Sequence, residues 1–328
     1  MNNKTCWVLS NGIIGMDNQS FGLAEALGFS VEKKTIVPVA PWTHLPPQLW
    51  FSPLKASFWP GSDHFEPPWP DVVIGTGRMT IAHSIAIKRA SKGHTFNIRI
   101  QHPRVALRHF DLVVAPKHDA CRGANVIETM GAIHGVTAEG MRLAGEKFAS
   151  QFSALPRPLV AVMVGGTNKC YQMTPEIGRI LGERLAAMSA STGAGILLTT
   201  SRRTGPEVEA ALRQALQGTP AYIWDGAGDN PYLAFLALAD YLVVTADSVN
   251  MVSEACSTGK PVFVVDLDGG SKKFRRFHEA MRSAGYTRSF TGALDRWSYT
   301  PLDDVGRVVR EVKMRMAANE AAVVASHK

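Results

Sequence analysis

Strand-length apolar runs alternate with helical patterns along most of this 328-residue sequence, and this alternation constrains the fold more than any other feature. A parallel sheet covered by helices produces such a pattern, because each crossover between parallel strands needs a helix-length connection. Strands are expected at residues 5–9, 71–74, 95–100, 111–114, 159–164, 195–200, 221–224, 241–245 and 261–265. Helices are expected at residues 18–27, 79–91, 175–190, 206–217, 231–239, 248–258 and 272–284. The sequence therefore predicts an α/β protein.

The segment QFSALPRP, residues 151–158, is the predicted domain boundary, because it holds two prolines and little periodicity. A chain of this length accommodates two domains of ordinary size. We expect a first domain at residues 1–152 and a second at residues 158–300. A last helix is expected within residues 301–328, and the sequence leaves open whether it packs back on the first domain.

The composition is that of a globular protein, with 45% hydrophobic and 19% charged residues. No apolar run approaches the roughly 20 residues that span a bilayer. The start of the chain lacks a signal-peptide core, and the four cysteines lie far apart without C-x-x-C spacing, which favours a cytoplasmic location and argues against zinc. The net charge of +7 suits an anionic membrane face or a phosphorylated substrate. We expect no nucleic-acid partner, because the basic residues are dispersed and no known module is recognisable.

An insertion rich in proline and aromatic residues, 38–71, interrupts the alternation. Its large aromatic residues are Trp42, Trp50, Phe51, Phe58, Trp59, Phe65 and Trp69. The interpretation that we favour is a loop anchored on the first domain by these side chains. The alternative is an interfacial belt that makes peripheral contact with a membrane, or with a lipid-linked acceptor, through residues 41–69.

Ligands bind at the carboxyl ends of the strands in open parallel sheets, so the residues that follow each strand are candidates for a site. The strand ending at Val164 is followed by a set of donors and one cation: Gly165, Gly166, Thr167, Asn168 and Lys169. This run is not a Walker A loop, because it lacks the full G-x-x-x-x-G-K-[ST] pattern. The next strand leads to Arg202 and Arg203 at the start of a helix. A pair of arginines alone is usually solvated, but its position beside the glycine run favours a diphosphate.

The stretch TADSVNMVSEACSTGKPVFVVDL, residues 245–267, has an unusually polar helix start. Ser248 is the expected N-cap, while Val252 and Cys256 recur at helical spacing with Val249 as the buried face. Glu254 lies about 200° around the helix from Val252 and is expected to point away from that face. A carboxylate there suits two vicinal hydroxyl groups, because it accepts two hydrogen bonds at once. The candidate binding residues are Asp247, Ser248, Asn250, Met251, Ser253 and Glu254.

The first half of the chain offers further polar residues at strand ends. Gly12 and Gly15 lie near the start of a helix, where backbone amides can approach an anion or a sugar. Their spacing is not G-x-G-x-x-G, and a tight turn alone also favours glycine. Later strands are followed by Arg78, His102, His118 and Asp119. Histidine and carboxylate groups transfer protons near neutral pH, although each of these residues alone is more often structural.

Taken in order, these segments resemble one family. DSVNMVSEACSTGKPVFV is similar to the C-terminal-domain motif of GT-B glycosyltransferases, in which a Ser/Thr-rich turn, a Glu and a G-x-P-V segment bind the nucleotide sugar. Together with GMDNQSFGLAEALG, DLVVAPKHD, MVGGTNKCYQ and TTSRRT, it makes residues 7–290 resemble the ELM1-like family. Plant members of that family are described as mitochondrial fission factors and bacterial members as candidate glycosyltransferases. The motifs are short, and their order and spacing carry the specificity.

The resemblance implies two Rossmann-like domains facing a cleft, as in GT-B enzymes, with the nucleotide-sugar donor on the second domain and the acceptor on the first. Glu254 would bind the ribose hydroxyls and Ser248 the phosphates or the sugar. The phosphate region would be lined by Gly165, Gly166 and Thr167. No metal and no cofactor besides the donor are expected, because GT-B enzymes stabilise the leaving diphosphate with positive groups and helix dipoles.

Other residues implied by the resemblance fall at the base and on the acceptor side. Trp224 precedes a loop that often meets the base in such folds. The acceptor side would include Gly12, Gly15, Gln19, Arg78 and His102. The candidates for the catalytic base are Asp17, His118 and Asp119. The segment NGIIG, residues 11–15, has two isoleucines where related proteins prefer polar residues, so the acceptor stays open.

The first functional hypothesis is an inverting, metal-independent glycosyltransferase that transfers a sugar from a nucleotide sugar to a lipid- or envelope-linked acceptor. A nucleotide-sugar epimerase is the second, because it shares the two-domain architecture. The third is a non-catalytic adaptor of the ELM1 type that acts in membrane or mitochondrial fission. Binding of nucleoside diphosphates separates the two enzymes from the adaptor.

Overall fold

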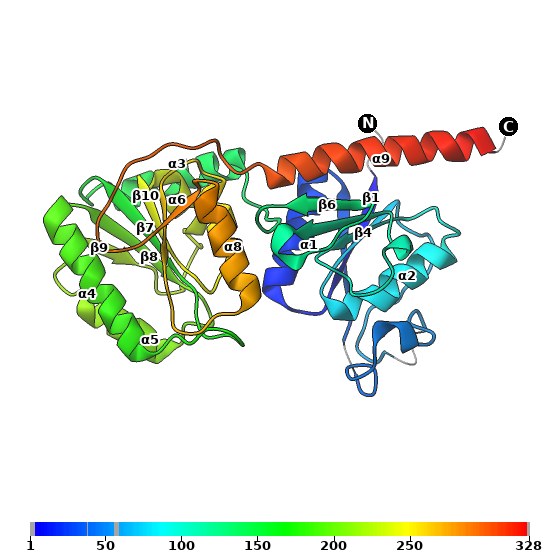
Figure 1. The fold of residues 1–328 in the computed structure, drawn as a ribbon, viewed down its shortest axis with the longest axis horizontal. Helices are drawn as coiled ribbons and strands as arrows, with labels where there is room; N and C mark the ends of the chain where they lie inside the picture. The colour runs from blue at the N-terminus through cyan, green and yellow to red at the C-terminus, as the bar shows by residue number, and fades with distance from the viewer. Residues whose placement is uncertain (1–3, 38, 56–58, 327–328) are drawn as a thin grey trace. The chain divides into compact units, whose positions relative to one another are not determined.

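The computed structural model describes residues 4–37, 39–55 and 59–326, with side chains up to residue 319, so Phe58 lies outside the described part. The chain forms two compact units. The first consists of Met1–Gly135 together with Asp303–Lys328, and the second of Val136–Leu302. Each unit has its own six-stranded parallel sheet with helices packed on it (Figure 1).

The sheet of the first unit has the strand order β2-β1-β3-β4-β5-β6, and every neighbouring pair is parallel. Its strands are β1 (Thr5–Ser10), β2 (Ser30–Thr35), β3 (Val72–Thr76), β4 (Phe96–Ile100), β5 (Leu112–Pro116) and β6 (Val126–Thr129). The winding direction changes between β1 and β3. The carboxyl ends of these two strands therefore form the switch point at which doubly wound sheets bind ligands.

Helices cover both faces of this sheet because the strands bury both of their faces. Side chains alternate along a strand, so Val8 packs with the side carrying α1 (Ile14–Leu27) and α9 (Asp304–Ser326). Trp7 points the other way and packs with α2 (Ile81–Ala90). The first unit also has short 3-10 helices: η1 (Pro47–Leu49), η3 (Arg78–Thr80), η4 (Leu107–His109) and η5 (Lys117–Asp119).

The helix α9 completes the first unit, although the chain reaches it only after passing through the second. Val308, Val312 and Met316 of α9 join the same apolar cluster as Leu23 of α1. The carboxylate of Asp304 accepts hydrogen bonds of 2.8 Å from the backbone amides of Met130 and Gly131. The last helix thus packs on the elements of the first domain.

The aromatic insertion is packed against α2. Trp42, Trp50 and Trp59 are at most 6% exposed and pack against one another. The rings of Trp50, Trp59 and Phe65 surround His83, which lies 4.6 Å from the Trp59 ring. Burial lowers the pKa of His83 to about 3, so this histidine is neutral at physiological pH. The rings of these tryptophans fill the space between the insertion and the helix, as the anchored-loop interpretation expects, and membrane contact through residues 41–69 stays a prediction. Phe51 of the insertion is 57% exposed.

The sheet of the second unit has the order β12-β11-β10-β7-β8-β9, which is the Rossmann order of a doubly wound sheet. Its strands are β7 (Leu159–Val164), β8 (Gly195–Thr200), β9 (Ala221–Ile223), β10 (Tyr241–Thr245), β11 (Val262–Val265) and β12 (Thr287–Ser289). Its helices are α3 (Ala138–Phe152), α4 (Pro175–Thr192), α5 (Pro206–Ala215), α6 (Tyr232–Leu238), α7 (Val249–Cys256) and α8 (Lys272–Ser283). The helix α4 lies beside α5, and α3 lies beside α6 (Figure 1).

The division between the units differs from the predicted boundary at 151–158. Phe152, at the end of α3, packs its ring against Phe235 and Tyr222 of the second unit, with centroid separations of 5.5 and 4.9 Å. The helix α3 therefore belongs to the second unit, and the division falls after Gly135. The prolines of QFSALPRP mark the turn from α3 into β7 instead of a linker.

Within the part of the chain that the structure describes, no helix is both long enough and apolar enough to cross a membrane.

Candidate functional site

Asp247 lies two residues after the end of β10, but its side chain is fully buried and its oxygens are used inside the unit. Oδ2 accepts a hydrogen bond from the amide of Gly166 and an ion-pair contact from the Arg203 guanidinium, both at 2.9 Å. Oδ1 accepts from the hydroxyl of Thr245 at 2.7 Å. Asp247 therefore ties together the turns after β7, β8 and β10, and the expectation that it binds a ligand is not supported by its geometry.

The glycine run after β7 is also engaged within the unit. The four amides of residues 165–168 donate in turn to Thr245 Oγ1, Asp247 Oδ2, Arg203 O and Tyr171 O. The backbone approaches so closely that a Cβ atom on Gly165 would lie 2.2 Å from the Asp247 carboxylate. A Cβ atom on Gly166 would lie 2.1 Å from the carbonyl of Arg203. The glycines allow this close packing, and their amides are not the phosphate donors that the sequence suggested.

Two cations beside these turns remain exposed. Lys169 follows the glycine run and Arg202 precedes Arg203, and both side chains face solvent. Neither forms an ion pair with any other residue that the structure describes. These two predicted residues keep the capacity to bind an anion, whereas Arg203 is committed to Asp247.

Glu254 on α7 is 9% exposed, although helical spacing predicted that it would point away from the buried face. Its Oε2 accepts a hydrogen bond from the hydroxyl of Tyr232 on α6. Burial raises the pKa of Glu254, and the Tyr232 hydrogen bond opposes that rise. The pKa of Tyr232 is raised too, by burial and then by the Glu254 carboxylate. Tyr232 therefore fixes one oxygen of Glu254.

Other predicted residues of α7 hold the helix itself. Ser248 is its N-cap and accepts from the Met251 amide at 3.3 Å, as predicted. Ser253 is fully buried and donates to the carbonyl of Val249 at 2.7 Å, so it does not face a ligand. Asn250 and Met251 are partly exposed on the first turn.

Trp224 follows β9 and closes the loop after it. Its indole nitrogen donates to the carbonyl of Ala227 at 2.9 Å, and its own carbonyl accepts from Arg213 at 3.2 Å. The side chain is therefore held against its own loop at the carboxyl edge of the sheet.

A recess of about 310 Å³ lies beside these turns, at the carboxyl ends of β10 and β11. Its lining consists of Tyr171, Ala246, Asp266, Leu267, Gly269, Gly270, Ser271, Arg275, His278 and Arg282. The two glycines both have φ of +106°, a conformation that side chains rarely adopt, and they carry the chain around the recess. Ser271 then caps α8 by accepting from the Phe274 amide. Sequence reasoning missed these residues, although a Gly-Gly-Ser turn between an apolar strand and a basic helix was a visible signal.

The electrostatics of this recess favour an anion. Arg275 and Arg282 outnumber the one carboxylate that lines it, Asp266, and the N-terminus of α8 adds the positive end of the helix dipole. His278 donates a hydrogen bond of 2.8 Å from its Nε2 to the carbonyl of Ala246, and burial lowers its pKa. Arg275 has no ion-pair partner among the described residues, so its charge is available to a ligand.

In the first unit, Asp17 on the first turn of α1 lies at the end of β1. Its Oδ2 accepts from the hydroxyl of Ser10 at 2.7 Å and lies 3.6 Å from the ammonium group of Lys33. Ser10 also accepts from the amide of Gly12, which has φ of +79°. Gly15 lies within α1. Asp17 and the two glycines therefore belong to one turn at the switch point of the first sheet.

The turns after β4 and β5 bring a second group of predicted residues together. The amide of His102 lies 3.5 Å from Asp119 Oδ2, and His118 Nε2 lies 4.0 Å from Asp119 Oδ1. Gln101 donates to Gln19 of α1 at 3.4 Å, which joins this group to the turn of Asp17. Gln101, Arg104 and Ala120 all have positive φ, although none is glycine. Such strain gathers at functional sites, and here it surrounds the predicted acid–base residues.

Arg78 does not face this group. Its guanidinium donates to the carbonyls of Thr43 and Leu45, at 2.9 and 2.6 Å, and so clamps the aromatic insertion onto η3. These two bonds correct the expectation that Arg78 binds an acceptor, because they commit its guanidinium to the insertion. A second arginine, the fully buried Arg99 of β4, donates to Gly77 O and Thr80 Oγ1 and fixes the same turn, and burial lowers its pKa to about 9.

No group of three or more His, Cys, Asp or Glu side chains in the described parts of the chain is arranged to hold a metal ion. The independence from metal stays a prediction.

The sequence profile of the mitochondrial fission ELM1 family matches residues 14–316. The chain belongs to this family. It is 34% identical over 281 residues to the mitochondrial fission protein ELM1 of Arabidopsis thaliana, a match that covers 77% of this chain and 66% of that relative. The ELM1-family resemblance seen in the sequence is therefore confirmed.

Solved structures with the same fold include UDP-GlcNAc 2-epimerases. The UDP-GlcNAc 2-epimerase of Methanocaldococcus jannaschii, in complex with UDP-GlcNAc and UDP, aligns with a TM-score of 0.54 and 12% identity, covering 94% of this chain and 99% of that one. The Neisseria meningitidis enzyme bound to UDP-GlcNAc aligns with a TM-score of 0.50 and 13% identity, covering 95% and 99%. The α/β class with two Rossmann-like units of the GT-B type is thus confirmed for this ELM1-family chain.

Proposed function

We propose that this ELM1-family chain is a glycosyltransferase that binds a nucleotide-sugar donor at the carboxyl edge of its second sheet. The observation that carries the proposal is the recess of about 310 Å³ beside β10 and β11, which combines two arginines with a helix N-terminus. Parallel sheets of this kind bind ligands at that edge, and helix N-termini favour phosphate. The UDP-GlcNAc bound by two epimerases of the same fold supports the same class of donor.

In this proposal the diphosphate lies against Arg275 and the first turn of α8. Charge-assisted hydrogen bonds from a guanidinium are short and strong, and they offset the charge that develops on a departing diphosphate. Arg282 and the exposed Lys169 and Arg202 add positive charge at the same edge. The chain's own cations therefore suffice for the leaving group, and we propose that no metal is needed.

Glu254 would bind the ribose. Its Oε2 is held by Tyr232, and among the described residues nothing donates a hydrogen bond to Oε1. A ribose hydroxyl can donate to that atom, and binding would favour the ionised carboxylate whose pKa burial has raised. Tyr232 acts here as a positioning residue, because it fixes the rotamer of the carboxylate.

The acceptor would react at the first unit, with a base from the strained group after β4 and β5 or from Asp17. The acceptor oxygen forms a bond to C1 of the sugar while the bond from C1 to the diphosphate oxygen breaks. The electron pair leaves with the nucleoside diphosphate, and the hydroxyl proton passes to the base. His118, Asp119 and Asp17 are the candidates. We propose a lipid- or envelope-linked acceptor.

Two other functions are favoured by particular findings. An epimerase is favoured by the activity of the structural relatives, and a fission adaptor by the name of the Arabidopsis relative. Release of an epimer from a nucleotide sugar in the absence of acceptor would support the first. Absence of any nucleotide binding would support the second.

The test is a thermal-shift panel of UDP, GDP, CMP, ADP and TDP, with their sugars, on the full chain. A ligand that binds only the folded state raises the melting temperature. We expect one nucleoside diphosphate to raise it, and Arg275→Ala to weaken the affinity about tenfold through loss of a charge-assisted hydrogen bond. Arg276→Ala is the matched control, because Arg276 is the exposed neighbour on α8 that does not line the recess. Equal losses in both variants, or no shift with any nucleotide, would contradict the proposed site.

A further inference from the structure

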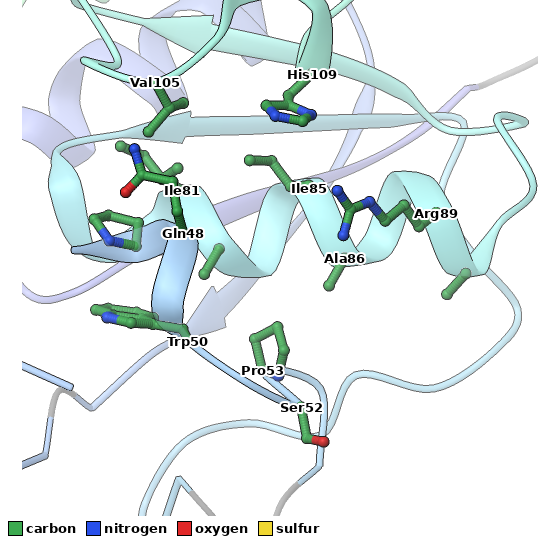
Figure 2. Close-up of a pocket in the computed structure, with 13 residues that line it drawn as sticks. Gln48, Trp50, Ser52, Pro53, Ile81, Ile85, Ala86, Arg89, Val105 and His109 are labelled. Carbon is green, nitrogen blue, oxygen red and sulfur yellow. The ribbon is translucent and has the colours of Figure 1, made fainter. Parts of the chain in front are cut away.

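A second concave feature lies wholly within the first unit. A groove of about 550 Å³ runs along α2, between that helix and residues 47–53 of the insertion. Figure 2 shows Ile81, Ile85 and Arg89 on successive turns of α2, with Trp50 and Pro53 on one side. Val105 and His109 line the other side. We call this feature the α2 groove.

Small side chains on α2 make room for this groove. Ala82, Ala86 and Ala90 recur every four residues and line it, so they lie on one face of the helix. The opposite wall is held in place by polar bonds, since the Trp50 indole donates to the carbonyl of Leu45 at 2.9 Å and Arg78 donates to that same carbonyl. The groove is therefore a supported apolar trough of the size of a small-molecule site.

One end of the α2 groove is strongly basic. Ile85, Arg89 and His109 also line an adjoining recess of about 260 Å³, and Lys88, Lys92, Gly93 and Arg108 complete that recess. Lys88 is neutralised by Asp111 at 2.6 Å. Arg89, Lys92 and Arg108 have no ion-pair partner within the described residues. The pKa of His109 is lowered by burial and then by the charges of Arg108, Arg89 and Lys88. Nearby positive charges disfavour a protonated histidine, so this shift is the one expected at a basic surface.

Exposed apolar side chains flank the apolar end. Leu49 is 62% exposed and Phe51 is 57% exposed, and they immediately precede and follow the groove-lining Trp50. Large apolar residues beside a concave apolar surface are typical of a site that receives hydrocarbon. The groove thus has an apolar trough, an apolar rim and a cationic end in one continuous surface.

We propose that the α2 groove binds one hydrocarbon chain of an anionic lipid, with the lipid phosphate against Arg89, Lys92 and Arg108. The trough excludes water from a chain of methylene groups, each of which contributes about 0.8 kcal/mol when buried. The three cations without partners match a phosphate, which accepts several charge-assisted hydrogen bonds. This inference goes beyond the proposed glycosyl transfer and does not depend on it, because every residue of the groove lies in the first unit.

A lipid fits this surface better than a protein partner. Stable protein interfaces bury about 800 Å² per partner. The α2 groove is instead a recess of ligand size that ends in unpaired cations. Binding of a second copy of the chain, or of an acidic peptide, is therefore an alternative that the test should detect.

The first experiment titrates dodecyl phosphate, below micelle formation, into the full chain and follows tryptophan fluorescence, because Trp50 lines the groove. Dodecyl maltoside and inorganic phosphate are the comparison probes. We expect saturable binding of dodecyl phosphate at least about tenfold tighter than either probe, since each probe offers only the apolar or the charged half of the contact. No preference for dodecyl phosphate would overturn the proposal.

Variants place the binding in the groove. Ala86→Phe should fill the trough, and Arg89→Glu should reverse the charge at its end, each weakening dodecyl phosphate about tenfold or more. Lys313→Glu is the matched control, because it makes the same charge change at an exposed residue of α9. Unchanged hydrogen-exchange protection of β1, β3 and β4 in all three variants shows that their first unit folds, and retention of the nucleotide thermal shift separates this proposal from the donor site. Unchanged binding in Ala86→Phe and Arg89→Glu would refute the groove.

The last arm uses membranes. Flotation with phosphatidylcholine vesicles, with and without phosphatidylglycerol, should recover the wild-type chain only on the anionic vesicles. Phe51→Ser and Arg89→Glu should lose that recovery, whereas Met314→Ser, which alters an exposed apolar residue of α9, should keep it. Sedimentation velocity of Ala86→Phe completes the test. A change from dimer to monomer in that variant would identify a second copy as the occupant and overturn the lipid.

Discussion

Asp247 stands where the sequence predicted a ligand-binding carboxylate, yet it holds three turns of the second unit together. Removing it leaves the Gly166 amide and the Thr245 hydroxyl without their acceptor in a buried region. Each unsatisfied buried group costs about 1–3 kcal/mol, so Asp247→Ala should lower the free energy of unfolding by about 2–4 kcal/mol. Arg202→Ala alters an exposed side chain beside the same turn and should change it by less than about 0.5 kcal/mol.

Urea denaturation of the full chain measures this difference. Similar midpoints for Asp247→Ala and Arg202→Ala would mean that the carboxylate is not part of the structural network. Binding of nucleotides by a folded Asp247→Asn variant would further separate a structural role from a contact with ligand.

The raised pKa of Glu254 predicts how the stability of the folded chain changes with pH. Its pKa is raised in the folded chain, mainly by burial, above the ordinary value of 4.5. As pH rises through 4.5, the unfolded chain releases this proton first, so the folded chain loses stability until pH passes the raised pKa. Glu254→Gln has no such proton, and its stability relative to wild type should increase from about pH 4 to about pH 7. Glu279→Gln, an exposed substitution on α8, should show no such increase.

Urea midpoints at the two pH values test this prediction. Parallel pH profiles for wild type and Glu254→Gln would contradict the raised pKa. A nucleotide that binds the ionised form of Glu254 should also reduce the loss of stability that the wild-type chain shows as pH rises, because it binds the deprotonated folded state.

Individual residues show how much of the candidate site could be predicted from the sequence. Position at a strand end correctly placed the residues after β7, β8 and β10 at one edge of the second sheet. It could not tell a ligand-binding carboxylate from Asp247, because two partners of Asp247, Gly166 and Arg203, come from turns more than forty residues away in the chain. Helical spacing placed Glu254 away from Val252, but the neighbouring helix α6 covers that side with Tyr232. Tertiary partners decided both cases.

At the scale of elements, long apolar runs were predicted well and polar edges were missed. The strands β3, β4, β5, β7, β8 and β10 are buried on both faces, so their runs are continuous and easily recognised. The strand β2 has the sequence SVEKKT and lies at the edge of its sheet, where exposed polar side chains hide the strand pattern. The edge strands β6 and β12 have only four and three residues. Such strands depend on their neighbour for hydrogen bonds, which local sequence does not reveal.

The insertion illustrates a related limit. Seven large aromatic residues in one loop are compatible with a membrane belt or with a packed cluster, and composition alone does not separate them. The structure buries Trp42, Trp50 and Trp59 in one cluster, in which Trp50 and Trp59 contact His83, and leaves Phe51 exposed. Packing against α2 thus determines which aromatics are available to a ligand, and it also creates the α2 groove. The surface proposed for lipid is a product of that packing.

At the scale of the whole molecule, the chain builds most of the first unit, passes through the second, and returns with α9. The first unit therefore depends on residues at both ends of the sequence. Val308 and Val312 of α9 are fully buried in the same cluster as Leu23 and Ile98. The second unit has its own sheet and its own apolar core, in which none of the α9 side chains that the structure describes takes part. We expect the two units to respond separately to a change in α9.

Val312→Asp tests this expectation, because it places a carboxylate among apolar side chains with no partner there to offset its desolvation. Hydrogen exchange measured by mass spectrometry should show loss of protection in β1, β3, β4 and α1, whereas β7, β10 and α7 stay protected. Lys313→Asp changes the exposed neighbour and should leave both units protected. Nucleotide binding, which we assign to the second unit, should survive Val312→Asp while dodecyl phosphate binding is lost. Equal loss of protection in both units would show instead that they unfold as one cooperative body, with α9 supporting the whole chain.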